Sequence, residues 1–93
     1  MSAKVSIILL WPYTAACGNR TTLDVEAGTV LEALRELAAK FPKAGELLLD
    51  GEGRPTGRIG LYLNKRDVRL LEDIHTGLKD GDKILILPAL SGG

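Results

Sequence analysis

Ile84-Leu85-Ile86-Leu87 is an unbroken apolar run close to the end of the 93-residue chain. A short apolar run that contains β-branched residues is typical of a strand covered on both faces. The segment from Lys4 to Trp11 carries a second run of this kind, which ends at Pro12. We expect both to be central strands, and because a long connection that contains a helix separates them, they can pair in parallel.

A further strand is predicted by the alternation of apolar and polar residues. Within Thr21–Glu26, Leu23 and Val25 fall on one face and polar residues on the other, which is the pattern of a half-buried strand. The residues Ala15–Asn19 before it have the composition of a turn. The first two strands are therefore expected to form an N-terminal hairpin.

A helix is predicted to begin after Thr29. Thr29 and Glu32 have the spacing of a capping box, in which the threonine side chain accepts from the Glu32 amide and the glutamate reaches back. Pro42 is expected to stop the helix near Lys40. Apolar residues recur between them at helical spacing and form one stripe: Val30, Leu31, Leu34, Leu37, Ala38 and Phe41.

Short apolar segments and turns fill the second half of the chain. Leu47–Leu49 fits either a short helical turn or a strand, and Gly51–Gly57 has the composition of a flexible loop. Ile59–Leu63 is predicted to be a third strand. A polar turn then precedes Val68–Leu71, where we expect a short strand, and a glycine-centred turn leads into the last strand.

This order of elements predicts an α+β fold. A hairpin, a helix and further strands form one layer of sheet with the helix packed across one face. With the first and last strands parallel at its centre, the arrangement is a β-grasp, or ubiquitin-like, fold. We expect a mixed sheet of four to five strands and one main helix. The domain would span residues 1–87, followed by a flexible tail over residues 88–93.

The composition excludes several classes of function. Twelve basic residues balance twelve acidic ones, and this argues against direct nucleic-acid binding, which needs a basic face. One cysteine and one histidine exclude a disulfide framework and a zinc site built on cysteines. No apolar stretch approaches the length of about 18 residues that a transmembrane helix needs. We expect no membrane association, no signal peptide and a cytoplasmic location.

The interior of the sequence offers no convincing active site. Cys17 would need a base close by to act as a nucleophile, and the sole candidate, His75, is distant in the sequence. The pair Asp80 and Asp82 lacks the spacing and the closing glutamate of a calcium loop, so a turn is expected there. The glycines between residues 51 and 60 lack the context of a phosphate-binding loop. We predict no catalytic residue, no metal ligand and no cofactor bound by this chain.

The end of the sequence is different, because it combines a strand, a proline and two final glycines. Pro88 is expected to halt the strand ladder and to keep the next residues extended. Glycine has no Cβ, so Gly92 and Gly93 could enter a narrow channel in any conformation. The carboxylate of Gly93 would then be presented to a partner as a reactive group. The remaining residues of this tail are Ala89, Leu90 and Ser91.

Two stretches carry a resemblance to a known family. Residues 61–69, with Asn64, Asp67, Val68 and Arg69, and residues 78–93, with Asp-Gly-Asp, Pro-Ala and Gly-Gly, resemble the MoaD/ThiS sulfur-carrier family. Within this family of ubiquitin-like proteins, the pattern looks closest to the CysO branch.

The resemblance implies a role as a carrier rather than as an enzyme. An E1-like adenylating enzyme of the MoeB/ThiF kind, which binds the ATP, would activate the Gly93 carboxylate. The product of sulfur transfer would be a thiocarboxylate that donates sulfur to a biosynthetic enzyme, with the cysteine branch favoured. Thiamine, molybdopterin and thiolated tRNA are the alternative destinations. The free carrier would be a monomer.

Two other functions stay open at this point. The chain could be a ubiquitin-like modifier that is conjugated to lysines through Gly93, which needs the same activated carboxyl group. It could also be a β-grasp interaction domain in which the tail has no role.

A docking surface is predicted from the alternation of side chains along strands. Apolar residues at alternate positions are expected to face the helix: Val5, Ile7, Leu61, Leu63, Ile84 and Ile86. The opposite face of the sheet would then be apolar as well, and its members would be Ile8, Leu10, Tyr62, Leu85 and Leu87. Such a patch marks a protein interface, so we expect the activating enzyme and the sulfur acceptor to dock there in turn. Cover by the loop or by a second copy is the alternative.

Overall fold

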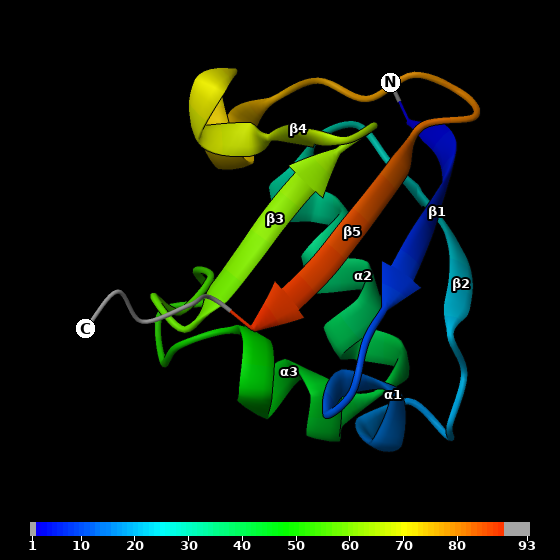
Figure 1. Ribbon diagram of the computed structural model, residues 1–93, viewed down its shortest axis with the longest axis vertical. Coiled ribbons are helices and arrows are strands. Elements are labelled where there is room, and N and C mark those ends of the chain that lie inside the picture. The colour runs from blue at the N-terminus through cyan, green and yellow to red at the C-terminus, as the bar shows by residue number, and fades with distance from the viewer. Residues whose placement is uncertain (1, 89–93) are drawn as a thin grey trace.

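The computed structural model describes residues 2–88, and a mixed five-stranded sheet in the order β2-β1-β5-β3-β4 organises them (Figure 1). The strands are β1 (Ala3–Leu9), β2 (Thr22–Ala27), β3 (Ile59–Leu63), β4 (Arg66–Asp67) and β5 (Lys83–Pro88). The helices are α1 (Tyr13–Ala16), α2 (Val30–Lys40) and α3 (Pro42–Leu48), and two 3₁₀ turns are η1 (Val68–Leu70) and η2 (Asp73–His75). Figure 1 shows α2 crossing behind the sheet. The predicted β-grasp fold is confirmed.

The first and last strands lie side by side at the centre of the sheet. They are parallel, with Ile7 opposite Ile84 and Leu9 opposite Ile86. Strand β2 pairs antiparallel with β1 on one side, and β3 pairs antiparallel with β5 on the other. The predicted hairpin and the predicted parallel pairing are both confirmed. One consequence follows for function: β1 and β5 end at the same end of the sheet, where the described residues stop at Pro88.

The core lies between the sheet and α2. The six strand residues that were predicted to face the helix are all buried, and so are four residues of α2: Val30, Ala33, Leu34 and Leu37. Each fully buried valine, leucine or isoleucine side chain of this layer contributes about 1.5–3 kcal/mol to the free energy of unfolding. This buried layer fixes which face of the sheet is left outward.

The start of α2 is capped much as predicted. The Thr29 hydroxyl accepts a hydrogen bond from the Glu32 amide over 3.2 Å. The Glu32 carboxylate accepts from the amide of Gly28, one residue before the cap, over 2.8 Å. The helix ends at Lys40 as expected, but Pro42 does more than stop it, because it is the first residue of α3.

The predicted turn at Ala15–Asn19 is confirmed only in its second half. Helix α1 occupies Tyr13–Ala16, and the turn covers the residues after it, with Gly18 and Asn19 in the left-handed conformation. Of the two alternatives for Leu47–Leu49, the helical one is confirmed, because Leu47 and Leu48 are the last residues of α3 and Leu49 caps it. Proline is well tolerated at the first position of a helix because the amide that it lacks has no partner there. Pro42 therefore fits the first turn of a second helix.

The predicted short strand at Val68–Leu71 is wrong. The strand that follows β3 is Arg66–Asp67, which pairs with Tyr62 and Leu63 across a tight turn. Two consecutive residues with positive φ, Asn64 and Lys65, form that turn, as the twist of a two-residue hairpin requires. Val68 is then drawn into the core as the start of η1.

Candidate functional site

The sheet presents its second face, opposite to α2, at the surface. In the middle of this face, Leu85 lies opposite Ile8 on one side and opposite Tyr62 on the other. All three side chains are half-buried. Since the register places them in one row across β1, β5 and β3, they form a continuous apolar strip.

A second row lies closer to the end of β5. Leu87 is opposite Gly60 on β3. A Cβ atom added to Gly60 would lie 3.7 Å from Leu87 Cγ and 3.9 Å from Tyr62 Cε1, so both side chains border this glycine. Leu10, which directly follows β1, is 45% exposed. The five residues predicted for the docking surface therefore lie outside the core, on or beside the outward face.

The same face is polar at its other end. Ser6 is opposite Lys83 on β5 and opposite Asp24 on β2. The Ser6 hydroxyl donates a hydrogen bond to Asp24 Oδ1 over 2.9 Å. Along β1 and β5, the outward face therefore changes from charged and hydrogen-bonded residues to apolar residues toward the end where β5 stops.

Pro88 marks that end. It is the last residue of β5 and pairs with Ile59, although it was predicted to be the first residue of the tail. The remaining tail residues, Ala89–Gly93, lie outside the described residues. The role of Gly93 as the reactive group therefore stays a prediction.

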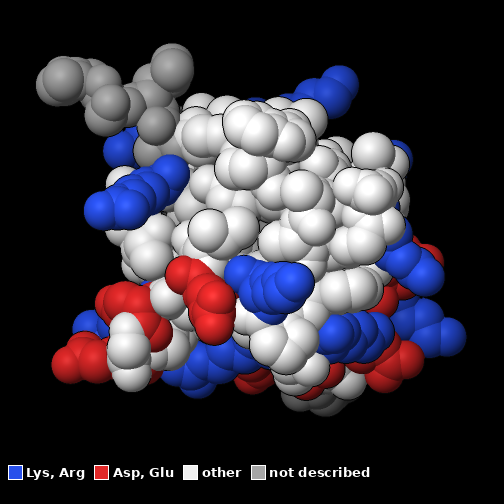
Figure 2. Space-filling view, turned by 90° about the horizontal axis from the view of Figure 1, so that it is seen from below, with Lys and Arg blue, Asp and Glu red and all other residues white. Residues whose placement is uncertain are grey.

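Trp11 is a surface residue that the predicted docking surface did not include. It directly follows Leu10 and is 77% exposed. Figure 2 looks onto this end of the molecule, where much of the surface is uncharged and the acidic side chains gather toward one side. The signal was present in the sequence, because the only tryptophan stands beside a proline just beyond an apolar strand.

A groove of about 800 Å³ runs along β3 from Leu87 and Pro88 toward η1 and η2. At its far end, the Arg69 guanidinium donates to both carboxylate oxygens of Asp67, with a shortest distance of 2.7 Å. These side-chain hydrogen bonds, together with one from the Arg69 amide, lower the pKa of Asp67. The pair joins the end of β4 to η1, so it has a structural explanation without a ligand.

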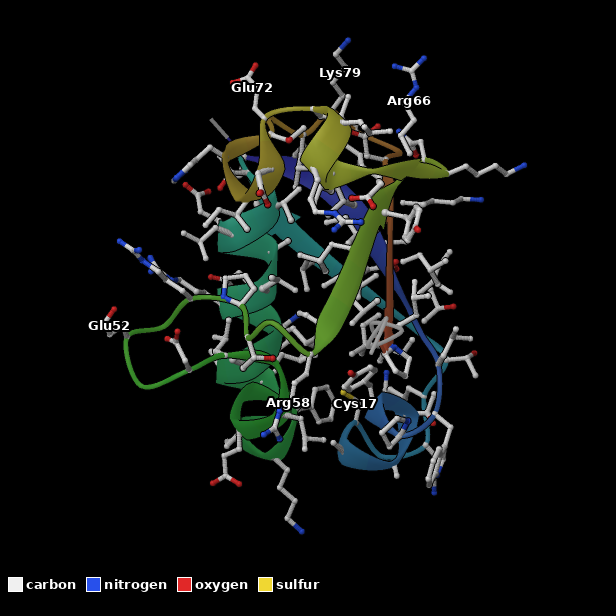
Figure 3. All side chains as sticks on the ribbon, turned by 60° about the vertical axis from the view of Figure 1, so that its left-hand side comes forward. Cys17, Glu52, Arg58, Arg66, Glu72 and Lys79 are labelled. Atoms are coloured by element: carbon white, nitrogen blue, oxygen red, sulfur yellow. The ribbon has the colours of Figure 1, made fainter. Side chains whose placement is uncertain are left out.

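Cys17 and His75 do not form a catalytic pair. Cys17 is fully buried at the end of the molecule that carries α1, and burial raises the pKa of its thiol. Figure 3 shows it far from Glu72, which directly precedes η2, the turn that contains His75. A buried thiol with a raised pKa is a poor nucleophile because the thiolate is the reactive form.

Asp80 and Asp82 hold the turn before β5. Asp80 Oδ1 accepts a hydrogen bond from the amide of Lys4, and Asp82 Oδ2 accepts one from the amide of Lys79. This is the turn that the sequence predicted. Across residues 2–88, no cluster of three histidine, cysteine, aspartate or glutamate residues is placed to hold a metal ion. Within the same range, no helix is both long and apolar enough to cross a membrane.

Comparison with known proteins gives consistent matches. The model of the ThiS family matches residues 8–93. The sulfur carrier protein CysO of Mycobacterium tuberculosis is 31% identical over 96 residues, which cover 100% of both chains. The solution structure of small archaeal modifier protein 1 from Methanosarcina acetivorans has a TM-score of 0.90 at 29% identity and covers 100% of this chain and 99% of that chain.

A solved complex is also similar. A chain in the crystal structure of the Amycolatopsis orientalis BexX/CysO complex has a TM-score of 0.83 at 27% identity, covering 96% of this chain and 99% of that chain. These matches confirm the resemblance predicted from residues 61–69 and 78–93.

Proposed function

The chain belongs to the ThiS family, and from this premise we propose that it is a ubiquitin-like sulfur carrier that acts through the carboxylate of Gly93. It would be a co-substrate of partner enzymes rather than an enzyme. The full-length similarity to a sulfur carrier protein supports this role. The crystal structure of a similar carrier in a complex supports interaction with partner enzymes in general.

The chemistry requires activation of the carboxylate. The Gly93 carboxylate attacks the α-phosphorus of ATP, pyrophosphate leaves, and an acyl-adenylate forms. Hydrosulfide, the sulfur donor in its simplest form, then attacks the acyl carbon, AMP leaves with the electrons of the acyl–oxygen bond, and loss of the proton on sulfur gives the thiocarboxylate. In this proposal an E1-like adenylating enzyme binds the ATP, and a separate sulfur source supplies the sulfur donor.

One observation carries the proposal. The parallel pairing of β1 and β5 brings the apolar part of the outward face and Pro88 to the same end of the sheet. An enzyme that docks on Ile8, Leu85 and Leu87 would therefore find the tail at the border of its own interface. In this arrangement the sheet provides binding and the tail provides the reacting group.

The destination of the sulfur is proposed to be cysteine biosynthesis, because the mycobacterial relative matched over its full length is the carrier CysO. Thiamine, molybdopterin and thiolated tRNA are the alternatives. The test is to supply the thiocarboxylate form to a cysteine synthase from the same organism and to measure cysteine formation. Turnover by the cysteine synthase supports the assignment, and turnover only by an enzyme of another pathway contradicts it.

Intact-mass spectrometry tests the carrier role itself. The chain is incubated with the adenylating enzyme of its source organism, ATP and a sulfur donor, and the mass of one oxygen replaced by one sulfur is expected. A variant that lacks Gly93 is the control and should keep its mass. The proposal is contradicted if the mass of the wild-type chain stays unchanged although the same enzyme preparation adenylates another carrier protein.

A modifier role is the second candidate, and the match to small archaeal modifier protein 1 favours it. Conjugation would use the same activated Gly93, with a lysine amine in place of the sulfur nucleophile. Peptides that carry the residues of the tail in an isopeptide bond to lysine, found in digests of cell lysate, would support this role. Their absence, in cells that make the thiocarboxylate, would leave sulfur transfer alone.

A further inference from the structure

Leu10 and Trp11 form an exposed apolar corner at the end of the sheet where β5 stops. Strand β1 ends at Leu9, which pairs with Ile86 of β5. The parallel register therefore brings Leu10, the residue after β1, to the end of the sheet where β5 stops, and Trp11 lies in the turn that follows, which is closed by a hydrogen bond from the Tyr13 amide to the Leu10 carbonyl. Leu10 is 45% exposed and Trp11 is 77% exposed.

The corner lies in a segment without charge. From Val5 to Asn19 the sequence holds no acidic or basic residue. An exposed tryptophan that is next to an exposed leucine, and continuous with the apolar row of Ile8, is more than a scattered apolar residue. Tryptophan is also among the residues that carry the largest share of binding energy in protein interfaces.

The length of the tail limits which partner can reach this corner. Five residues separate Pro88 from the carboxylate of Gly93, and a fully extended chain spans about 3.4 Å per residue, or about 17 Å in all. An enzyme that reacts with Gly93 must therefore bring its surface close to Pro88. The Leu10–Trp11 corner lies at the same end of the sheet as Pro88, so such an enzyme can contact it.

We infer that Trp11, supported by Leu10, anchors the adenylating enzyme that acts on Gly93, an inference that rests on the proposed function. Trp11 has no role in the chemistry, because the reacting group is carried by the tail. It acts as a binding residue whose contacts are the same before and during adenylation. Uniform binding of this kind lowers KM and leaves kcat unchanged.

Steady-state kinetics of pyrophosphate release from ATP test the inference, with the adenylating enzyme of the source organism and the full chain as substrate. The Trp11→Ala variant should raise KM for the carrier about 30-fold, the effect typical of a strong interface residue, with kcat unchanged. Trp11→Phe should recover part of this loss. The matched control is Leu70→Ala, because Leu70 is 80% exposed and lies on η1, at the opposite end of β3.

A ¹⁹F NMR measurement reports directly on the environment of Trp11. Trp11 is the only tryptophan, so a chain made with 5-fluorotryptophan gives one ¹⁹F resonance. On addition of the unlabelled adenylating enzyme, this resonance should shift or broaden and should lose its sensitivity to exchange of H₂O for D₂O. The Leu70→Ala chain with the same label should behave like the wild type.

The outcomes separate the inference from the proposed function. If the wild-type chain is adenylated and Trp11→Ala has the KM of the wild type, the inference is wrong and the carrier role stands. If the wild-type chain is not adenylated, both are wrong. If the ¹⁹F resonance changes with the concentration of the carrier alone, the corner is a contact between two copies of this chain, and the assignment to the enzyme is overturned.

Discussion

The side-chain amide of Asn64 donates a hydrogen bond to Asp82 Oδ1 over 2.8 Å and so joins two turns that are distant in the sequence. The carbonyl of the same amide accepts from the amide of Lys83 over 3.0 Å. Asn64 lies in the turn between β3 and β4, and Asp82 directly precedes β5. These contacts hold the end of β3 against the start of the strand that leads to the tail.

Replacement of Asn64 should therefore destabilise the fold in two separable ways. Asn64 has a φ of 50°, a conformation that glycine adopts freely and alanine does not. Asn64→Gly loses the two hydrogen bonds and gives the unfolded chain more conformational freedom, and it should cost about 1–2 kcal/mol. Asn64→Ala also forces alanine into the left-handed backbone conformation, and this strain should cost about 1 kcal/mol more. Urea denaturation measures both, and equal stability of the two variants would show that the backbone conformation contributes nothing.

A second prediction concerns the contact between α2 and α3. A Cβ atom on Gly45 would lie 2.8 Å from Ala38 Cβ, which is too close for two carbon atoms. Gly45→Ala should destabilise the protein by about 1–3 kcal/mol because the helices must move apart, although alanine favours a helix. Gly51→Ala is the matched control, since nothing lies within 4 Å of its added Cβ. A melting temperature of Gly45→Ala that is equal to or above that of the wild type would contradict the predicted clash.

A third prediction concerns the pH dependence of the pair Asp67 and Arg69. The side-chain hydrogen bonds from Arg69 lower the pKa of Asp67. The pair therefore stabilises the fold at pH values above the unfolded pKa of about 3.9, and this contribution is lost as the pH falls through the lower folded pKa. In an NMR titration, the pKa of Asp67 should lie below its usual value and should rise in Arg69→Gln. An identical pKa in both chains would contradict the role of Arg69.

The elements that the sequence predicted correctly depend on local or strongly patterned signals. The apolar run of Ile84–Leu87 and the alternation in Thr21–Glu26 carry the period of a strand, and Thr29 with Glu32 carries the chemistry of a cap. Each signal is contained within a few residues. The outward face followed from them, because burial of one set of alternate side chains leaves the other set on the surface.

The elements that were missed depend on contacts across the fold. Pro42 can end one helix or begin the next, and the close packing of Gly45 against Ala38 belongs to the second arrangement. Val68 leaves the strand pattern because the core accepts its side chain. The apolar run predicts Trp11 as the end of a strand, whereas its exposure follows from β1 ending two residues earlier, at Leu9.

The docking surface gives a fourth prediction. Leu85 lies between Ile8 and Tyr62 at the centre of the outward face and is half-buried there. Leu85→Asp should weaken binding to the adenylating enzyme because it places a charge in an apolar contact. Leu70→Asp is the control, since this residue is exposed on η1. Isothermal titration calorimetry checks the affinities and circular dichroism checks the fold. Equal affinity of Leu85→Asp and the wild type would remove this face from the interface.

The last prediction concerns the tail. Deletion of Gly93 would shift the carboxylate back by about 3.3–3.6 Å, the length of one extended residue. A misplacement of about 1 Å can already cost about 100-fold in rate, so adenylation of the shortened chain should fall by at least that factor. A residue added after Gly93 should be equally damaging because the carboxylate becomes an amide. Gly92→Val keeps the length but restricts the backbone and widens the tail, so it should also slow adenylation.

These changes lie beyond the core residues, so the melting temperatures of the deletion, the extension and Gly92→Val should match that of the wild type. Pyrophosphate exchange with the adenylating enzyme then reports the chemistry without interference from folding. The extra residue is placed after Gly93 because an insertion before Pro88 would shift the register of β5 against its neighbouring strands. If the deleted and extended chains are adenylated as fast as the wild type, Gly93 is not the reacting group. The sulfur-carrier and modifier roles would then both fall, and a β-grasp interaction domain would be the remaining function.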